Sequence, residues 1–127
     1  MGNALDIGKK LVELCRQGKG LEAVETLYGP NIVSIEAHES PSFPARIEGI
    51  VAVKEKNERW YGNNVVHKAD IRGPWPQGDR FIVSSTYEFT SKSGPMAGKR
   101  TTFEEAAIYT VKNGKIVQEE FFYEMPG

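Results

Sequence analysis

The sequence contains little cysteine and little histidine, and these two shortages remove several kinds of site. The single Cys15 can form neither an internal disulfide nor a cysteine-based zinc site. Because it falls on the apolar face of the first helical segment, we interpret it as a small buried hydrophobic residue. The two histidines, His38 and His67, do not have the spacing of a helical ligand pair. We therefore predict no metal site.

An excess of charge of either sign is also missing. Lysine and arginine together number 16, and aspartate and glutamate 17, which gives a formal net charge of -1. Binding to nucleic acid or to an anionic membrane surface requires a strong positive field, so we expect neither partner. No apolar stretch is long enough to span a bilayer, and no apolar run follows a basic N-terminus. We predict a cytoplasmic protein.

Familiar motifs of catalysis and nucleotide binding are absent as well. The sequence has no glycine-rich phosphate loop between a strand and a helix, no serine nucleophile elbow and no dinucleotide fingerprint. Its 127 residues are the size of one domain, and they contain no repeat or linker. We expect a single domain over residues 1–127 that uses no cofactor.

What the sequence does contain is a long β-hairpin over residues 99–125. Two β-rich runs flank Asn113-Gly114, a dipeptide that accepts the positive φ angles of a two-residue turn. This turn pairs Lys112 with Lys115, and counting outward from that pair assigns each later side chain to one of two faces. Large apolar side chains fall on both faces. We therefore expect helices to cover one face and a second subunit to cover the other.

Strict alternation along the hairpin separates an interior from an exterior. It assigns Glu119, Phe121 and Tyr123 to the interior, and each of the Glu-Glu pairs, 104–105 and 119–120, contributes one carboxylate to each face. A β-bulge in the last strand would instead make Glu120 and Phe122 the interior groups, in place of Glu119 and Phe121. The exterior carries apolar side chains that a homodimer would bury: Ile82, Tyr109 and Phe122.

The rest of the chain shows the periods of helices and strands. Apolar spacing of three and four residues predicts a helix that ends near Gly18, a second that Gly29-Pro30 stops, and a third between Gly49 and Gly62. Alternating patterns predict strands at NIVSIEA, at VVHKADIRG and over residues 81–89. We predict an α+β fold with three helices and four to six mostly antiparallel strands.

Polar residues among the apolar side chains of these segments are the candidates for chemistry. His67 alternates with apolar residues, and Glu119 lies on the predicted interior face. Acid–base catalysis requires such groups in an apolar pocket, where desolvation moves their pKa values toward neutrality. We predict His67 and Glu119 as catalytic residues, although a strand histidine can also be simply a buried, hydrogen-bonded group. The predicted ligand-binding residues are Glu36, Asn57, Trp60, Tyr87, Phe121 and Tyr123.

Three segments, YGPNIVSIEA, RIEGIVAVKEKNERW and GKIVQEEFFY, resemble the nuclear transport factor 2-like superfamily in its SnoaL-like branch. The resemblance covers essentially the whole chain. It implies a single SnoaL-like domain in which a strongly bent sheet is wrapped into a cone, a cystatin-like α+β barrel with helices over its open side. It also implies an apolar ligand pocket and a homodimer that packs the outer faces of its sheets.

The resemblance leaves the function open, because members of this superfamily include polyketide cyclases, ketosteroid isomerases, dehydratases, epoxide hydrolases and proteins with no known chemistry. In the cyclases, the last strand carries a His-Trp-Asp tripeptide whose Asp is the acid/base. Counted from the Gly-Lys-Ile turn, Phe121 occupies that Asp position, while Glu119 and Glu120 occupy the other two.

Two hypotheses of different classes follow. The chain is a cofactor-independent isomerase, lyase or cyclase that uses acid–base chemistry on a small apolar carbonyl or hydroxyl compound. Alternatively, it is a non-catalytic small-ligand-binding or dimeric interaction module.

Overall fold

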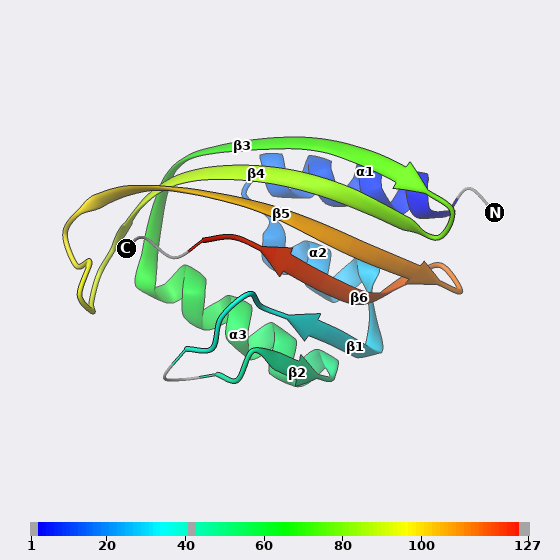
Figure 1. Ribbon diagram of the computed structural model, residues 1–127, viewed down its shortest axis with the longest axis horizontal. Helices are drawn as coiled ribbons and strands as arrows, with labels where there is room; N and C mark the ends of the chain where they lie inside the picture. The colour runs from blue at the N-terminus through cyan, green and yellow to red at the C-terminus, as the bar shows by residue number, and fades with distance from the viewer. Residues whose placement is uncertain (1–2, 41–42, 125–127) are drawn as a thin grey trace.

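The computed structural model describes residues 3–40 and 43–124 and contains three helices and a six-stranded sheet (Figure 1). The helices are α1 (Asn3–Arg16), α2 (Gly20–Leu27) and α3 (Ile50–Asn63). The strands are β1 (Tyr28–Ile35), β2 (Arg46–Glu48), β3 (Asn64–Gln77), β4 (Arg80–Ser91), β5 (Arg100–Lys112) and β6 (Lys115–Phe122). The predicted α+β class is confirmed. None of the described helices is long and apolar enough to cross a membrane.

The sheet has the strand order β2-β1-β6-β5-β4-β3, with β2 and β3 at its edges. The β1–β6 pair is parallel and the other neighbouring pairs are antiparallel. Because β1 follows the first two helices and β6 is the second strand of the C-terminal hairpin, their pairing joins the N-terminal part of the protein to the C-terminal part. The long strands β3, β4 and β5 curve together, so the sheet forms the predicted bent, open cone (Figure 1).

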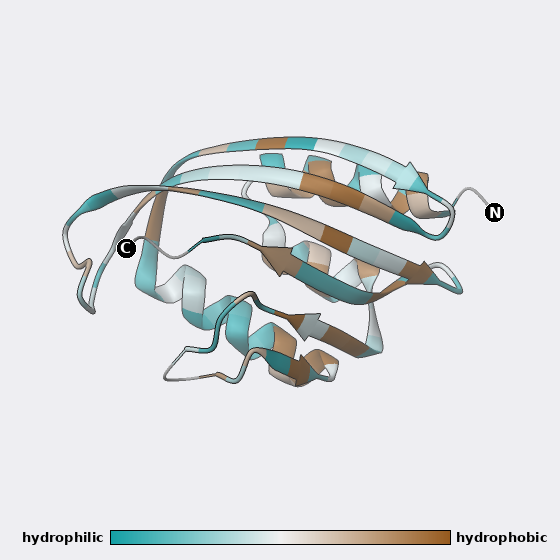
Figure 2. Cartoon of the chain, in the orientation of Figure 1, coloured by the Kyte–Doolittle hydropathy of each residue, from teal (hydrophilic) through white to brown (hydrophobic). Residues whose placement is uncertain are grey.

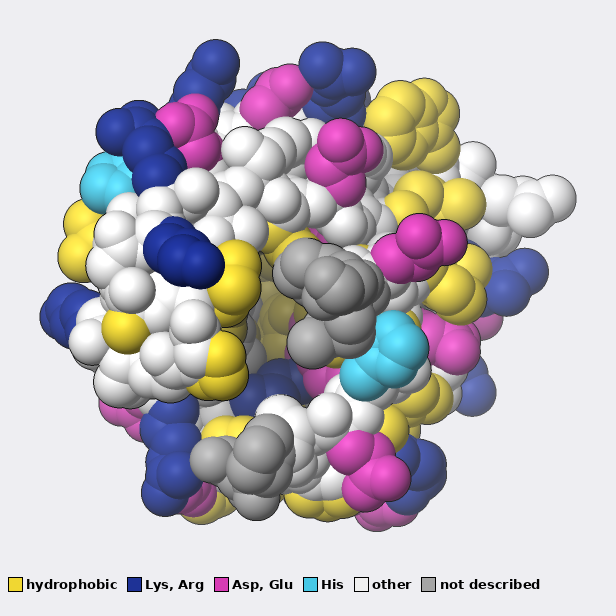
Figure 3. Space-filling model, turned by 60° about the vertical axis from the view of Figure 1, so that its left-hand side comes forward, with side chains coloured by type: hydrophobic (Ala, Val, Ile, Leu, Met, Phe, Trp, Pro, Cys, Tyr) yellow, Lys and Arg dark blue, Asp and Glu magenta, His cyan; other side chains and the backbone are white. Residues whose placement is uncertain are grey.

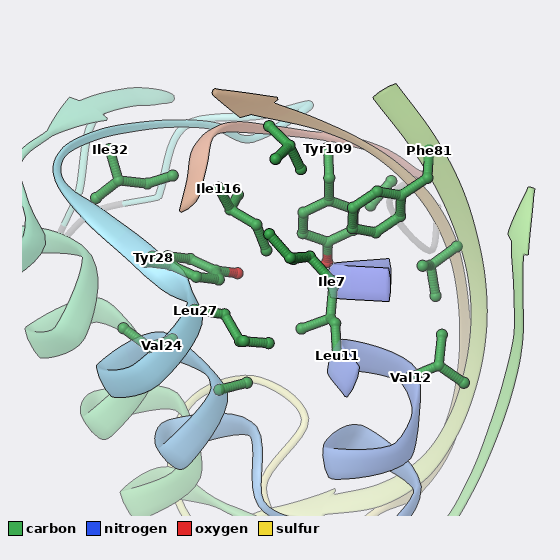
Figure 4. Close-up of a cluster of buried hydrophobic side chains, with 14 of the residues drawn as sticks. Ile7, Leu11, Val12, Val24, Leu27, Tyr28, Ile32, Phe81, Tyr109 and Ile116 are labelled. Atoms are coloured by element: carbon green, nitrogen blue, oxygen red, sulfur yellow. The ribbon is translucent and has the colours of Figure 1, made fainter. Parts of the chain in front are cut away.

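The core lies between the inner face of the sheet and the first two helices (Figure 4). Ile7 and Leu11 of α1 and Leu27 of α2 meet side chains of the sheet there. Among these, Phe81 and Tyr109 stack with ring centroids 5.0 Å apart. Burying a large apolar side chain stabilises the fold by about 1.5–3 kcal/mol. Hydrophobic residues are interspersed with hydrophilic ones along β5 and β6, as an incompletely covered sheet requires (Figure 2).

Helix α1 approaches the sheet closely at Gly8. A Cβ atom at this position would lie 2.8 Å from the Cβ of Pro74 and 3.2 Å from Cδ2 of Phe81. Real Cβ atoms essentially never lie within 3.0 Å of another heavy atom, so only glycine lets α1 lie against Pro74 of β3 at this distance.

The Asn113-Gly114 hairpin turn is confirmed. Lys112 lies opposite Lys115, as predicted. The φ angles are 52° at Asn113 and 77° at Gly114, in the left-handed region that this turn requires. The turn therefore fixes the first pair of the register.

A β-bulge at Val117 then changes the register of the hairpin. Val111 lies opposite Ile116, but the next residue away from the turn on β5, Thr110, lies opposite Gln118. Val117 is therefore the extra residue, and Tyr109 lies opposite Glu119. Tyr109 is 7% exposed and belongs to the core. The prediction that Tyr109 lies on the outer face is therefore wrong, because strict alternation took no account of the extra residue. Glu119 lies on the inner face, as predicted.

A second β-bulge decides the position of His67. The register of β3 shifts between Val66 and Lys68, so His67 is the extra residue there. Strict alternation back from the buried Ile71 would place this imidazole inside, whereas the bulge turns it outward. His67 is exposed, and its Nε2 lies 2.7 Å from Oγ1 of Thr90. The prediction that His67 points into the interior is wrong for this reason.

The outer face of the sheet carries an apolar row that runs across three strands. Trp75 of β3 pairs with Ile82 of β4, and Ile82 pairs with Ile108 of β5. Ile82 is 40% exposed, and Phe122 on the same face is 47% exposed. Both residues therefore lie on the outer face, as predicted.

Candidate functional site

A cavity of about 740 Å³ lies between α3 and the inner face of β4, β5 and β6. The core fills the inner face near the hairpin turn, and the cavity extends from the core toward the other end of the strands. Figure 3 shows the hollow, with hydrophobic side chains inside it and charged side chains at its edge. The volume is typical of pockets for small organic ligands.

Aromatic side chains form much of the cavity wall. On the side of α3, the ring of Trp60 lies 6.2 Å from that of Tyr87. On the side of β5 and β6, the rings of Phe103 and Tyr123 are 5.1 Å apart, and Phe121 lines the wall next to them. These rings supply large apolar contact areas, and polar side chains between them can orient a ligand.

Glu119 is the most deeply buried carboxyl group of the site, with 2% of the residue exposed. The hydroxyl of Tyr28 donates to its Oε1, and Ser34 Oγ donates to its Oε2 at 2.7 Å. Burial raises the pKa of Glu119, while the Lys56 ammonium and both hydroxyl donors oppose the rise. Both oxygens of Glu119 therefore already have a donor.

Lys56 of α3 continues this polar network toward the solvent. Its Nζ donates to Ser34 Oγ at 2.7 Å and to Glu36 Oε2 at 2.8 Å. The hydroxyl of Tyr123 donates to the other oxygen of Glu36 at 2.9 Å. A hydrogen-bonded chain thus runs from the buried Glu119 through Ser34 and Lys56 to Glu36.

Glu105 of β5 is a cavity residue that the sequence reasoning assigned to the exterior. It lies four residues before Tyr109, the cross-strand partner of Glu119, which places the two carboxyl-bearing positions about 13 Å apart along the strands. Because the bulge at Val117 puts Glu119 on the same face as Tyr109, Glu119 also shares that face with the rest of the alternating set of β5, Glu105 included.

The carboxyl group of Glu105 has a different environment from that of Glu119. Within residues 3–40 and 43–124, no hydrogen bond or ion pair reaches it. Burial raises the pKa of Glu105 to about 8, with further increases from the charges of Glu36 and Glu119 that Lys56 partly offsets. Glu105 is therefore a free acid group that titrates close to neutral pH.

The structure brings the predicted site residues together, with the exception of His67, which does not line the cavity. Asn57 reaches the cavity, but its Nδ2 donates to the backbone oxygen of Val53 at 2.9 Å. This bond favours the local structural interpretation of the amide. The predicted residues that line the cavity are Glu36, Asn57, Trp60, Tyr87, Glu119, Phe121 and Tyr123.

Lys56 and Ser34 belong to the polar network of the candidate site, and the sequence reasoning missed both. Lys56 lies three residues after Val53 and four before Trp60, so helical spacing already placed it beside the apolar stripe of α3. Ser34 alternates with Ile32 in the first strand, and its inward direction was readable from that pattern. Glu105 alternates with the buried Ala107 and Tyr109 of β5, but the count that ignored the bulge in β6 put this whole set on the outer face.

In the described part of the chain, neither the thiol nor the acidic side chains form a recognisable metal or nucleophile site. Burial, followed by the charges of Glu105 and Glu119, raises the pKa of Cys15 to about 11, so the thiol stays protonated and unreactive. Among the described residues, no group of three or more His, Cys, Asp or Glu side chains is arranged to hold a metal ion.

The family model of the SnoaL-like domain matches residues 3–123 of the chain. A candidate SnoaL-like polyketide cyclase (carbohydrate phosphatase) from Mesorhizobium loti has a similar solved structure. It shares 37% sequence identity over 94% of this chain and 97% of its own, with a TM-score of 0.85. No curated protein matches the chain.

More distant structures show the same fold. A candidate isomerase from Bacillus subtilis is 14% identical over 96% of this chain and 86% of its own, with a TM-score of 0.75. An LEH-like epoxide hydrolase from M. tuberculosis is 17% identical over 96% of this chain and 83% of its own, with a TM-score of 0.70. At these identities the likeness concerns the fold alone.

Proposed function

The chain belongs to the SnoaL-like domain family, and from that premise we propose that its cavity binds a small, largely apolar carbonyl or hydroxyl compound and exchanges a proton with it. No cofactor is needed for this step. Isomerisation, elimination and cyclisation of such compounds all begin with the movement of a proton to oxygen or from carbon. The aromatic walls of the cavity suit the apolar body of such a ligand.

The observation that carries the proposal is the free carboxyl group of Glu105. Because its pKa is about 8, the neutral acid predominates at neutral pH and can donate its proton to a carbonyl or hydroxyl oxygen. The ionised fraction at the same pH can accept a proton. A group with this pKa works in either direction with little change of pH.

Glu119 supports this chemistry through its charge, since it is one of the causes of the raised pKa of Glu105. Direct proton transfer by Glu119, as the sequence suggested, stays a prediction. Its two oxygens are engaged by Tyr28 and Ser34, so a ligand would have to displace one of these donors. His67 has no part in the proposal.

Deuterium exchange tests the proton transfer even when the product of the reaction is unknown. Native mass spectrometry of the purified protein identifies any retained ligand, and a panel of ketones of similar size and shape is then incubated with protein in deuterated water. We expect loss of the NMR signals of hydrogens next to the carbonyl group. Glu105→Gln should abolish this loss, and the matched control Glu104→Gln, on the exposed outer face, should not.

A non-catalytic binding module is the second candidate function. It is favoured by Phe121, which occupies the position of the acid/base in the cyclases of the family, and by the engaged oxygens of Glu119. In that case ketones bind in the cavity with no exchange above the rate of free solution. The deuterium experiment therefore separates the two functions.

We further propose a homodimer that packs the outer faces of two sheets. The apolar row of Trp75, Ile82 and Ile108 lies on that face, away from the helices that cover the other. A contiguous apolar surface of this kind favours a protein partner, and a second copy is the simplest one. The cytoplasmic location also stays a prediction.

A further inference from the structure

Acidic groups outnumber basic ones inside the cavity. Glu36, Glu105 and Glu119 line it together with the half-buried ammonium group of Lys56. Two of the three hydrogens of that ammonium are already donated to Glu36 and Ser34. One positive charge cannot balance three carboxylates, so the inner cavity has a negative potential when they are ionised.

The other basic residues of the lining lie at the cavity edge. Arg59 has a side chain that is 60% exposed and forms an ion pair with Glu55 at 3.4 Å. His38 is exposed, and its ring lies 5.6 Å from that of Tyr123. Solvent screens both groups, so neither neutralises the inner carboxyl groups.

Burial is the largest cause of the raised pKa of Glu105, and this imbalance of charge adds to it. After burial, the charges of Glu36 and Glu119 are the largest causes of its raised pKa, and they outweigh Lys56. Glu105 is therefore protonated at neutral pH because it is buried and because no cation among the described residues forms an ion pair with it. A cation bound in the cavity would balance the negative charge of the Glu105 carboxylate in place of the proton.

The aromatic wall of the cavity already accepts cations. Lys56 Nζ lies 5.5 Å from the ring centroid of Phe121, and the guanidinium of Arg59 lies 5.4 Å from that of Phe43. The faces of aromatic rings attract positive charge, most strongly where water is excluded. Further rings, those of Trp60 and Tyr87, line the same cavity and are available to a ligand.

From the surplus of carboxyl groups, the free carboxyl of Glu105 and the aromatic walls, we infer that the cavity selects a small amine whose ammonium group pairs with Glu105. The inference rests on the proposed function only in that a small ligand occupies the cavity. When the ammonium binds, the O–H bond of the Glu105 acid breaks and its proton passes to the solvent buffer. The carboxylate that remains beside the ligand is then available as a base.

Three probes that differ only in charge test this inference: 4-phenylbutylamine, 4-phenylbutan-1-ol and 4-phenylbutyrate. Binding is followed by the fluorescence of Trp60 in a Trp75→Phe background, which leaves one tryptophan as the reporter. At pH 8.5 we expect the amine to bind at least tenfold more tightly than the alcohol, and the carboxylate to bind most weakly. Between pH 6 and 8 the affinity for the amine should rise by up to tenfold per pH unit, since Glu105 must lose its proton, while that for the alcohol stays constant.

Variants at adjacent positions provide the control. Glu105→Gln should bring the affinity for the amine to within threefold of that for the alcohol and remove its pH dependence. Glu105→Asp should retain both, and so should Glu104→Gln on the exposed face.

Equal binding of amine and alcohol by the wild-type protein would overturn the inference and leave the proposed function standing. Absence of binding of all three probes, measured also by ligand-observed NMR, would overturn the inference, and the proposed cavity ligand with it.

Discussion

Tyr28 donates its phenolic hydrogen to Glu119 at the junction where β1 runs parallel to β6. The two residues are 91 positions apart in the chain, and both are buried. Their hydrogen bond therefore links the helical first part of the protein to the C-terminal hairpin. It also holds the carboxyl group of Glu119 at the deep end of the cavity.

We predict that Tyr28→Phe lowers the free energy of unfolding by about 1–3 kcal/mol, because one oxygen of a buried carboxyl group loses its donor. Urea unfolding at pH 7 measures the change. The double variant Tyr28→Phe/Glu119→Gln is the control, since the two residues interact directly. A coupling energy of at least about 0.5 kcal/mol is expected, and additive effects of the two substitutions would contradict the assignment.

The stability of the protein should fall as the pH rises from 4.5 to about 8 because of Glu105. In this range the unfolded chain ionises Glu105 while the folded protein keeps it protonated, so rising pH favours unfolding. The shift corresponds to at most about 5 kcal/mol, and water in the open cavity reduces this to roughly 2 kcal/mol. Glu105→Gln should therefore match the wild type at pH 4.5 and exceed its stability by roughly 2 kcal/mol at pH 8.5.

Thermal or urea unfolding across this pH range measures that difference, with Glu104→Gln as the control. Glu104 is exposed on the other face of the same strand, so its substitution should leave the pH dependence of the wild type unchanged. A constant difference between Glu105→Gln and the wild type at all pH values would show that Glu105 ionises normally in the folded state.

Two glycines on helices should respond to alanine in opposite directions. Gly8→Ala places a methyl group 2.8 Å from Pro74 and should cost about 1–3 kcal/mol of stability. Gly62→Ala in α3 has no heavy atom within 4 Å of its new methyl group and should gain about 0.5–1 kcal/mol, because alanine favours the helix. Chemical unfolding of both variants measures this, and a stable Gly8→Ala protein would show that α1 lies farther from the sheet.

The proposed dimer should depend on Ile108 at the centre of the outer face. We expect Ile108→Lys to convert a dimer of micromolar or tighter affinity into a folded monomer, because a lysine charge would be buried between two sheets. Light scattering coupled to gel filtration measures the mass, and circular dichroism confirms the fold. Val51→Lys, at a residue of α3 that is 78% exposed, is the control and should not change the mass. A wild-type protein that is monomeric at micromolar concentration would refute the dimer.

The elements of this fold were readable from the sequence because their signals are local. The turn at Asn113-Gly114 requires φ angles that few residues adopt, and helix α3 ends near Gly62 as its pattern indicated. The cavity position of Trp60 followed from helical spacing alone. Short β2 and the parallel pairing of β1 with β6 had no such local signal, since both depend on contacts between distant segments.

The polar groups of the site were harder to assign, because a strand offers only alternation as evidence. Alternation failed at His67, which is itself the extra residue of a bulge in β3. It failed at Glu105 because the uncounted bulge at Val117 of β6 put Glu105 and Glu119 on opposite faces in the prediction, whereas they share one. It succeeded at Glu119. A bulge is stabilised by the packing of the whole sheet, so the residues next to it in the sequence do not predict it.

Side chains of β6 alternate between the two faces of the sheet, and the extra residue Val117 reverses this alternation for every residue after it. Without this one extra residue, Glu120 and Phe122 would face the ligand, and Glu119 and Phe121 would face away. A single inserted or deleted residue near the turn can thus exchange the whole set of β6 side chains in the cavity while leaving each of them unchanged. For this architecture, counting from the turn is an unreliable way to match acids between relatives, and the face on which a carboxylate lies is the property to compare.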